Sequence, residues 1–372
     1  MDSRRSHLAV STMDTPPDPN LVGDLRRRDS VADVGSYATG SAGGDRGETN
    51  GATVTKIDLR TRILGRLIGM ASVTRRSEQQ ILADQRRVIG HNPLTDLLLG
   101  GLAEGVSVKN TTAVGADGRV GVRLYRAARF EEKLPLVVFM HGGGWTSGTL
   151  DTYDWLASNI ARDAGVVVAS VDYRLAPGHR WPAAVEDAYA ATVDLISRGE
   201  QLGADTTRVA VVGDSAGGNL AAVVALMARD RSGPSIAFQG LIYPATDLTM
   251  ASASIEENAH APILTRADML AFRSHYLHGH DPRDPYVSPL LADDLAGLPP
   301  ALIQVAEHDP LRDDGLRYAE ALLAAGVPVR TTTYFGMPHG FMAFPKISRA
   351  VPQALGELCQ ELRRVLLGQP TP

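Results

Sequence analysis

The sequence predicts an α/β fold, in which a mostly parallel central sheet is flanked by helices. From Val106 onward, short apolar segments alternate with stretches of helical periodicity. Six of these segments are strand candidates of the kind that is buried on both faces of a parallel sheet. They are Leu136–Met140, Val166–Val171, Val209–Val212, Phe238–Tyr243, Ala301–Ala306 and Val329–Tyr334. An antiparallel start is expected over Val106–Tyr125, where a Gly-Ala-Asp-Gly turn joins two alternating runs.

Composition restricts the class of protein. The chain has 372 residues with 37 Lys plus Arg against 42 Asp plus Glu, and a net charge of −5 argues against nucleic acid as a partner. Hydrophobic residues make up 44% of the chain, enough for a large core. The single cysteine, Cys359, excludes an intrachain disulfide scaffold. Since no apolar run approaches the roughly 18 residues of a membrane span and no signal-peptide pattern is seen, we expect a cytoplasmic protein.

The first 100 residues divide into two parts. Residues 1–55 are rich in Ser, Asp, Gly, Pro and Arg, and we expect a disordered tail there. Residues 56–100 have helical periodicity, and a first, basic amphipathic helix is followed by a second that should end near Asn92-Pro93. The apolar face of the first helix consists of Ile63, Leu64, Leu67 and Ile68. A further insertion is expected at about 246–285, where it should cover the functional site.

The strongest chemical signal is the sequence G-D-S-A-G at residues 213–217. It follows the strand candidate Val209–Val212 and precedes a helical pattern, which is the context of a nucleophile elbow centred on Ser215. The positions two before and two after the nucleophile must be small for strand and helix to pass closely, and both are glycine. We therefore predict that Ser215 is a catalytic nucleophile.

A second glycine-rich segment, H-G-G-G-W at residues 141–145, directly follows the strand candidate Leu136–Met140. Backbone N–H groups of Gly143 and Gly144, joined by that of Ala216, are expected to converge on a carbonyl oxygen as it becomes negative. The Gly-x-Gly-x-x-Gly spacing of a dinucleotide-binding turn is absent, and no acidic residue follows in the ribose position. We expect no cofactor.

The general base should be a histidine downstream of Ser215. His339 is the preferred candidate among six, because it lies in a turn-rich loop between the last strand candidate and the C-terminal helical segment of about 348–367. Three of the other histidines, His275, His278 and His280, fall in the insertion. They have no partner cluster elsewhere, so solvated surface is preferred to a metal site.

The acid should follow a strand end between Ser215 and His339, and residues 307–315 supply several carboxylates. Asp309 is preferred because it precedes Pro310, which favours an extended residue before it and leaves the side chain free to project. Asp313 is the alternative, although a carboxylate in the first turn of a helix also has a structural explanation.

Together these motifs resemble the hormone-sensitive-lipase-like branch of the α/β-hydrolases, a family of bacterial esterases. H-G-G-G-W, G-D-S-A-G-G-N-L and D-P-L-R-D-D-G occur in order, and the likeness extends over about residues 57–367. Gly178 stands where the family usually has an acidic residue. The resemblance implies an α/β-hydrolase fold with a helical cap, a triad of Ser215, Asp309 and His339, and short to medium acyl esters as substrates.

The predicted reaction is acyl transfer from a small-molecule ester to Ser215 and then to water. Transfer to another alcohol or amine is one alternative, and a non-catalytic ligand-binding protein on the same fold is another. The basic helix over residues 56–70 is interpreted as part of the cap, and its apolar face is expected to lie over the acyl pocket; contact with a lipid surface is the alternative.

Overall fold

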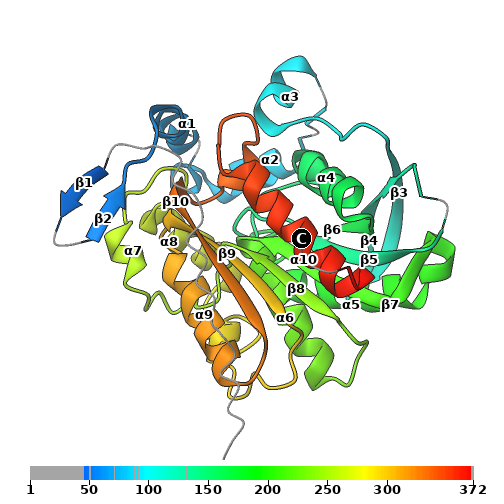
Figure 1. Cartoon of the computed structure of the whole chain (residues 1–372). Helices are drawn as coiled ribbons and strands as arrows, with labels where there is room; N and C mark the ends of the chain where they lie inside the picture. Colours follow the sequence, from blue (N-terminus) through cyan, green and yellow to red (C-terminus); the bar gives the residue numbers. More distant parts are fainter. Residues whose placement is uncertain are drawn as a thin grey trace, which may run out of the picture. The chain divides into compact units, whose positions relative to one another are not determined.

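An eight-stranded sheet forms the centre of the computed structural model, which describes residues 46–49, 52–70, 72–87, 89–90, 92–130 and 132–369 (Figure 1). The strand order is β10-β9-β8-β7-β5-β6-β4-β3. The strands are β3 (Val106–Gly115), β4 (Gly118–Ala127), β5 (Leu134–Met140), β6 (Val167–Asp172), β7 (Ala204–Asp214), β8 (Phe238–Ile242), β9 (Ala301–His308) and β10 (Val329–Pro338). All neighbours from β10 to β6 run parallel, whereas β4 pairs antiparallel with both β6 and β3. The predicted fold class is therefore confirmed.

The β3–β4 hairpin has the turn that the sequence predicts. Gly115 pairs with Gly118, so Ala116 and Asp117 form a two-residue connection. Gly118 has φ of +100°, a conformation that glycine adopts without the steric cost that other residues meet. The hairpin thus forms the antiparallel edge of the sheet.

Helices cover both faces of the sheet. They are α4 (Asp154–Ala164) and α10 (Val351–Leu367) on one face, and α5 (Ala183–Ser197), α6 (Ala216–Asp230) and α9 (Arg312–Ala324) on the other. Side chains of β5 alternate between the two layers, with Val137 and Phe139 packed toward α4 and α10, and Val138 packed toward α5 and α6. Every residue of β5 is buried, as expected for a central parallel strand.

A short hairpin of β1 (Arg46–Thr49) and β2 (Ala52–Thr55) lies within the range where the sequence suggested a disordered tail. The backbone N–H of Thr55 donates to Oε1 of Glu307 at 3.1 Å, and Nε2 of His308 contacts the Thr55 carbonyl oxygen. These contacts come from β9, more than 250 residues away in sequence, so local composition could not reveal them. Residues 1–45 of the expected tail lie outside the described residues.

The next segment is helical, with α1 (Leu59–Met70), the short 3₁₀ turn η1 (Val73–Arg75), α2 (Glu78–Gln85) and α3 (Pro93–Leu99). The expected helix end at Asn92-Pro93 is wrong, because α2 ends at Gln85 and Pro93 starts α3. The Asn92 side chain caps the new helix by accepting a hydrogen bond from Thr95 N–H at 3.1 Å. Proline suits the first helical position, where its missing N–H costs no hydrogen bond.

The insertion contains α7 (Ser254–Glu257) and α8 (Arg266–Leu277). Thr265 begins α8 with a capping box, in which its hydroxyl accepts from the backbone of Asp268 and the Asp268 carboxylate accepts from the backbone of Thr265. Helix α1 packs on the insertion at Gly65, where an added Cβ would lie 2.4 Å from Cβ of Pro262. In the described part of the chain, no helix is long and apolar enough to cross a membrane.

Candidate active site

Ser215 occupies a strained turn between β7 and α6. Its φ is +55° and its ψ is −119°, a conformation that a serine adopts rarely. The close approach of strand and helix requires the two flanking glycines, because a Cβ at Gly213 would lie 2.2 Å from the carbonyl oxygen of Gly217. A Cβ at Gly217 would lie 2.0 Å from the carbonyl oxygen of Met140. The structure therefore forms the sharp elbow that the motif predicts.

Three side chains from separate loops form a continuous row of hydrogen bonds. Nε2 of His339 lies 2.9 Å from Oγ of Ser215, and Nδ1 of His339 lies 2.8 Å from Oδ2 of Asp309. His339 follows β10 and Asp309 follows β9, so both approach Ser215 from the carboxyl ends of parallel strands. Asp309 is fully buried, and its other oxygen accepts from the N–H of Leu311 at 2.8 Å.

The alternative acid, Asp313, lies elsewhere. Its carboxylate accepts from the backbone N–H of Ser254 at 2.9 Å and pairs with Arg312 at 2.8 Å. Asp313 lies in the first turn of α9, as expected, where a carboxylate interacts favourably with the helix dipole. Its contact with Ser254 also ties the start of α9 to the insertion.

The glycine-rich loop after β5 lies beside Ser215. Gly143 and Gly144 have φ of +117° and +59°, and together with Ala216 they line the same cavity as Ser215. The backbone N–H groups of these three residues make no hydrogen bond to any described residue. The arrangement leaves three N–H donors beside Ser215, a geometry that could stabilise an oxyanion formed there.

Asp214, which precedes Ser215, links the turn after β7 to the glycine-rich loop after β5 and was not singled out from the sequence. Its carboxylate accepts from the N–H of Gly142 at 2.8 Å and from the hydroxyl of Tyr153 at 3.0 Å. Burial raises the pKa of Asp214 to about 6, so the carboxylate is mostly ionised at pH 7. The motif contains Asp214, but Tyr153 is 61 residues away and nothing in the sequence joins them.

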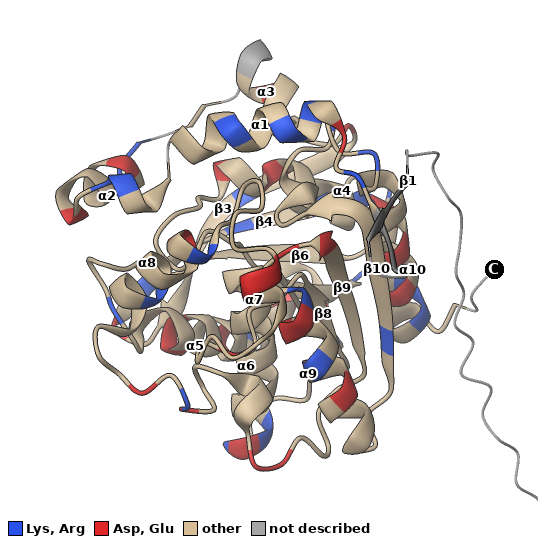
Figure 2. Cartoon of the chain, turned by 90° about the vertical axis from the view of Figure 1, so that its left-hand side faces the viewer, with Lys and Arg blue, Asp and Glu red and all other residues tan. Residues whose placement is uncertain are grey.

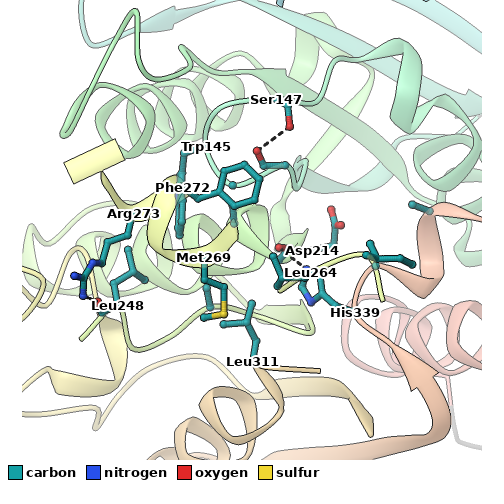
Figure 3. Close-up of a pocket in the computed structure, with 18 of the residues that line it drawn as sticks. Trp145, Ser147, Asp214, Leu248, Leu264, Met269, Phe272, Arg273, Leu311 and His339 are labelled. Carbon is teal, nitrogen blue, oxygen red and sulfur yellow. Dashed lines mark hydrogen bonds between the residues drawn. The ribbon is translucent and has the colours of Figure 1, made fainter. Parts of the chain in front are cut away.

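A cavity of about 340 Å³ opens onto Ser215 and His339. Its wall is predominantly apolar and combines side chains from the loops after the sheet strands with side chains of the insertion and with Ile68 of α1. In Figure 3, His339 lies at one side of the cavity and Arg273 at the other, with Met269 and Phe272 between them. The volume is at the lower end of the range for small-molecule sites.

Comparisons with known proteins agree with this geometry. A family model of the α/β hydrolase fold matches residues 137–343. Carboxylesterase NlhH of Mycobacterium tuberculosis (strain ATCC 25618 / H37Rv) is 47% identical over 259 residues, which cover 68% of this chain and 81% of that protein. The chain belongs to the α/β hydrolase family.

The family match and the carboxylesterase relatives support the hormone-sensitive-lipase-like branch that the motifs predicted. Ethyl acetate hydrolase of Pseudomonas putida is 36% identical over 275 residues, covering 73% of this chain and 86% of that protein. The crystal structure of a thermostable esterase from Pseudomonas putida ECU1011 superposes with a TM-score of 0.74 at 33% identity, covering 84% of this chain and 98% of that one. The chain is accordingly a serine ester hydrolase.

The N-terminal segment of this hydrolase contributes less to the cavity than its sequence suggested. Of the four apolar residues of α1 expected over the pocket, Ile68 lines the cavity, whereas Ile63 and Leu67 are 50% and 55% exposed. The buried face of α1 instead centres on Thr61 and Gly65. The close contact of Gly65 with Pro262 turns this smaller face inward, so the expectation for Ile63 and Leu67 is wrong.

A second cavity of about 230 Å³ lies on the other side of Phe272. Phe272 and Ser147 line both cavities and form the partition between them. The Phe272 ring covers Gly144, where an added Cβ would lie 2.4 Å from the ring, and the Ser147 hydroxyl donates to the carbonyl oxygen of Gly143 at 2.9 Å. Helical periodicity included Phe272 in the insertion but could not show that it divides two cavities.

Proposed function

We propose that this hydrolase cleaves carboxylic esters of short to medium acyl length by a two-step serine mechanism. The hydrogen-bonded row of Ser215, His339 and Asp309 carries the proposal, because it supplies a nucleophile, a base and an orienting carboxylate within 2.9 Å of one another along the row. The unpartnered N–H groups of Gly143, Gly144 and Ala216 supply the oxyanion hole.

In the first step, Oγ of Ser215 attacks the ester carbonyl carbon while Nε2 of His339 takes the hydroxyl proton. The carbonyl oxygen becomes negative and is stabilised by the three N–H donors. His339 then donates the proton to the leaving alkoxide, so that an alcohol departs and an acyl group remains on Ser215. In the second step water attacks the acyl carbon while Nε2 of His339 takes one of its protons. His339 then returns this proton to Oγ of Ser215 as the acyl–oxygen bond breaks, which releases a carboxylic acid and restores Ser215.

Asp309 orients the imidazole. Its Oδ2 accepts from Nδ1–H of His339, which leaves Nε2 without a proton and able to accept one from Ser215. The carboxylate also stabilises the imidazolium that forms during each step. Because Leu311 N–H holds the second oxygen, the carboxylate cannot rotate without losing a buried hydrogen bond.

Acyl length is limited by the cavity next to the triad. Phe272 and Ser147 close its side toward the second cavity, and Leu264 and Met269 of the insertion complete an apolar wall. A short or medium acyl chain fits a predominantly apolar cavity of about 340 Å³. The names of relatives, carboxylesterase and ethyl acetate hydrolase, are in keeping with such substrates.

The test is hydrolysis of p-nitrophenyl esters of graded acyl length by the full chain. We expect turnover to peak at short or medium chains and to fall by several orders of magnitude in Ser215→Ala. Ser197→Ala, on the exposed end of α5, is the matched control and should behave as the parent protein. A fluorophosphonate should form one covalent adduct per chain, and mass spectrometry should locate it at Ser215. Turnover that survives Ser215→Ala, or labelling of another serine, would disprove the proposed mechanism.

A further inference from the structure

One face of α1 carries a row of exposed apolar side chains. Leu59 is 69% exposed, Ile63 50%, Leu67 55% and Met70 64%. Their spacing of four, four and three residues places them within about 80° of one another around the helix axis, since each residue advances about 100°. We call these four residues the α1 stripe.

The stripe cannot turn inward, because the opposite face of the same helix is already occupied. Thr61 and Gly65 are buried, Gly65 is in close contact with Pro262, and Ile68 lines the active-site cavity. A rotation that buried the stripe would remove these contacts. The apolar surface is therefore presented outward in the folded protein.

Arginines flank the stripe on both sides. At 100° per residue, Arg60 lies beside one edge, and Arg62 and Arg66 lie beside the other. Helix α1 contains no acidic residue, and these three side chains make no ion pair with any described residue. The basic positions along α1 are visible in Figure 2, on a chain whose net charge is −5.

A second set of exposed apolar side chains belongs to the segment around α3, which lies at the same end of the molecule as α1 in Figures 1 and 2. Leu97 is 56% exposed, Leu98 40% and Leu102 42%. Isolated exposed leucines are common on protein surfaces, but a row of four such residues on one helix face, with three more on another segment at the same end, is a feature of interaction sites.

We propose that the α1 stripe and its flanking arginines dock this hydrolase onto an anionic lipid surface. An apolar strip bordered by arginines is the pattern of helices that lie in the plane of a membrane interface. The side chains of the stripe enter the acyl region and the arginines contact lipid phosphates. With four apolar residues and three arginines the attachment is reversible and sensitive to salt.

Charge selects this occupant over a second copy of the chain. A symmetric dimer through the stripe would bring Arg60, Arg62 and Arg66 of one copy toward the same residues of the other, with no acidic residue of α1 to pair with them. An uncharged apolar partner would leave all three arginines without counter-charges. An anionic lipid surface accommodates both the apolar and the basic parts.

Docking in this way also has a consequence for the enzyme. Helix α1 lines the cavity with Ile68 and carries the α1 stripe on its outer face, so the helix that contacts lipid is also part of the cavity wall. Ester molecules dissolved in the lipid would then be concentrated at the cap side of the cavity.

Vesicle co-sedimentation of the full chain carrying Ser215→Ala tests the proposal independently of any hydrolysis. The probe is a set of vesicles of phosphatidylglycerol and phosphatidylcholine, compared with phosphatidylcholine alone. We expect at least tenfold tighter binding to the anionic vesicles at low salt, and loss of most of this preference at high salt. The variants Ile63→Asp with Leu67→Asp, and Arg60→Gln with Arg62→Gln and Arg66→Gln, should each weaken binding about tenfold or more.

Leu323→Asp is the matched control, because Leu323 is 54% exposed on α9 and belongs to neither surface segment. It should bind vesicles as the parent does. Made in the chain that keeps Ser215, the same substitutions at Ile63 and Leu67 should leave turnover of a soluble short ester normal, since neither residue lines the cavity. Equal binding by the stripe variants and the parent, or no binding to anionic vesicles at all, would overturn the proposal. A dimer in solution that Leu67→Asp dissociates would overturn it in favour of a second copy.

Discussion

Replacement of Asp309 with asparagine tests the direction of the hydrogen bonds along the proposed triad. The Leu311 N–H is a fixed donor to Oδ1 of Asp309 at 2.8 Å, so an asparagine must keep its carbonyl oxygen at that position. Its NH₂ group then takes the place of Oδ2, 2.8 Å from Nδ1 of His339. An NH₂ group donates only, and Nδ1 must therefore become an acceptor.

The consequence is a change of tautomer. His339 must carry its proton on Nε2, the nitrogen that lies 2.9 Å from Oγ of Ser215. In that state Nε2 cannot take the hydroxyl proton. The loss expected for such a reversal in a serine triad is about 10³ to 10⁴ in turnover, or about 4 to 5.5 kcal/mol in activation free energy.

The assay is steady-state hydrolysis of p-nitrophenyl butyrate near pH 8, with kcat and KM measured separately. The loss should fall on kcat, because the change acts on proton transfer and leaves the cavity wall intact. Labelling of Ser215 by a fluorophosphonate should slow to a similar degree. Thermal unfolding of the variant should remain cooperative, which separates a loss of chemistry from a loss of fold.

Asp313→Asn is the matched control, since Asp313 contacts Arg312 and the backbone of Ser254 and not the imidazole. It should lower kcat far less than Asp309→Asn. If Asp309→Asn lowered kcat less than tenfold, or if Asp313→Asn lowered kcat more than Asp309→Asn did, the reasoning from the Leu311 donor would be refuted. Asp309 would then not be the orienting acid.

Two further outcomes are expected. Phe272→Ala should join the cavities of 340 and 230 Å³ and raise the turnover of longer acyl esters relative to short ones. Leu264→Ala enlarges only the first cavity and should shift the chain-length profile less. Equal shifts in the two variants would argue that Phe272 does not separate the cavities. Burial raises the pKa of Asp314 from 3.8 to about 7, so its contribution to stability is full below about pH 4 and is lost as pH rises through 7. The Tm of Asp314→Asn minus that of the parent should therefore increase as the pH rises from 5 to 8, whereas the same difference for the exposed Asp293→Asn should not change. A Tm difference for Asp314→Asn that is independent of pH would contradict the raised pKa.

Much of the part of this protein that follows Val106 could be predicted from the sequence. The G-D-S-A-G turn, the H-G-G-G-W loop and the loops that carry Asp309 and His339 each follow an apolar strand candidate. Parallel strands place their carboxyl ends at one edge of the sheet, so motifs at those ends must come together. Each motif depends on residues close to it in sequence, namely an apolar strand before it and small residues in the turn, so it can be recognised from the sequence.

The N-terminal segment up to about residue 100 was predicted less well. Helical periodicity located the α1 segment but assigned Ile63 and Leu67 to the pocket, and Asn92-Pro93 was interpreted as a helix end although it begins α3. An amphipathic pattern shows that a helix has an apolar face, but not which neighbour covers it. The contact of Gly65 with Pro262, nearly 200 residues away, decides that question for α1.

The sequence by itself thus determined the order of the strands along the chain, the nucleophile elbow and the candidates for base and acid. Only the tertiary structure decided that Asp214 and Tyr153 anchor the loop after β5, that Phe272 separates two cavities, and that the α1 stripe faces outward. The difference has one physical reason. Strand, turn and elbow preferences arise among residues close in sequence, whereas burial, cavity shape and hydrogen bonds between distant segments arise when the chain packs against itself.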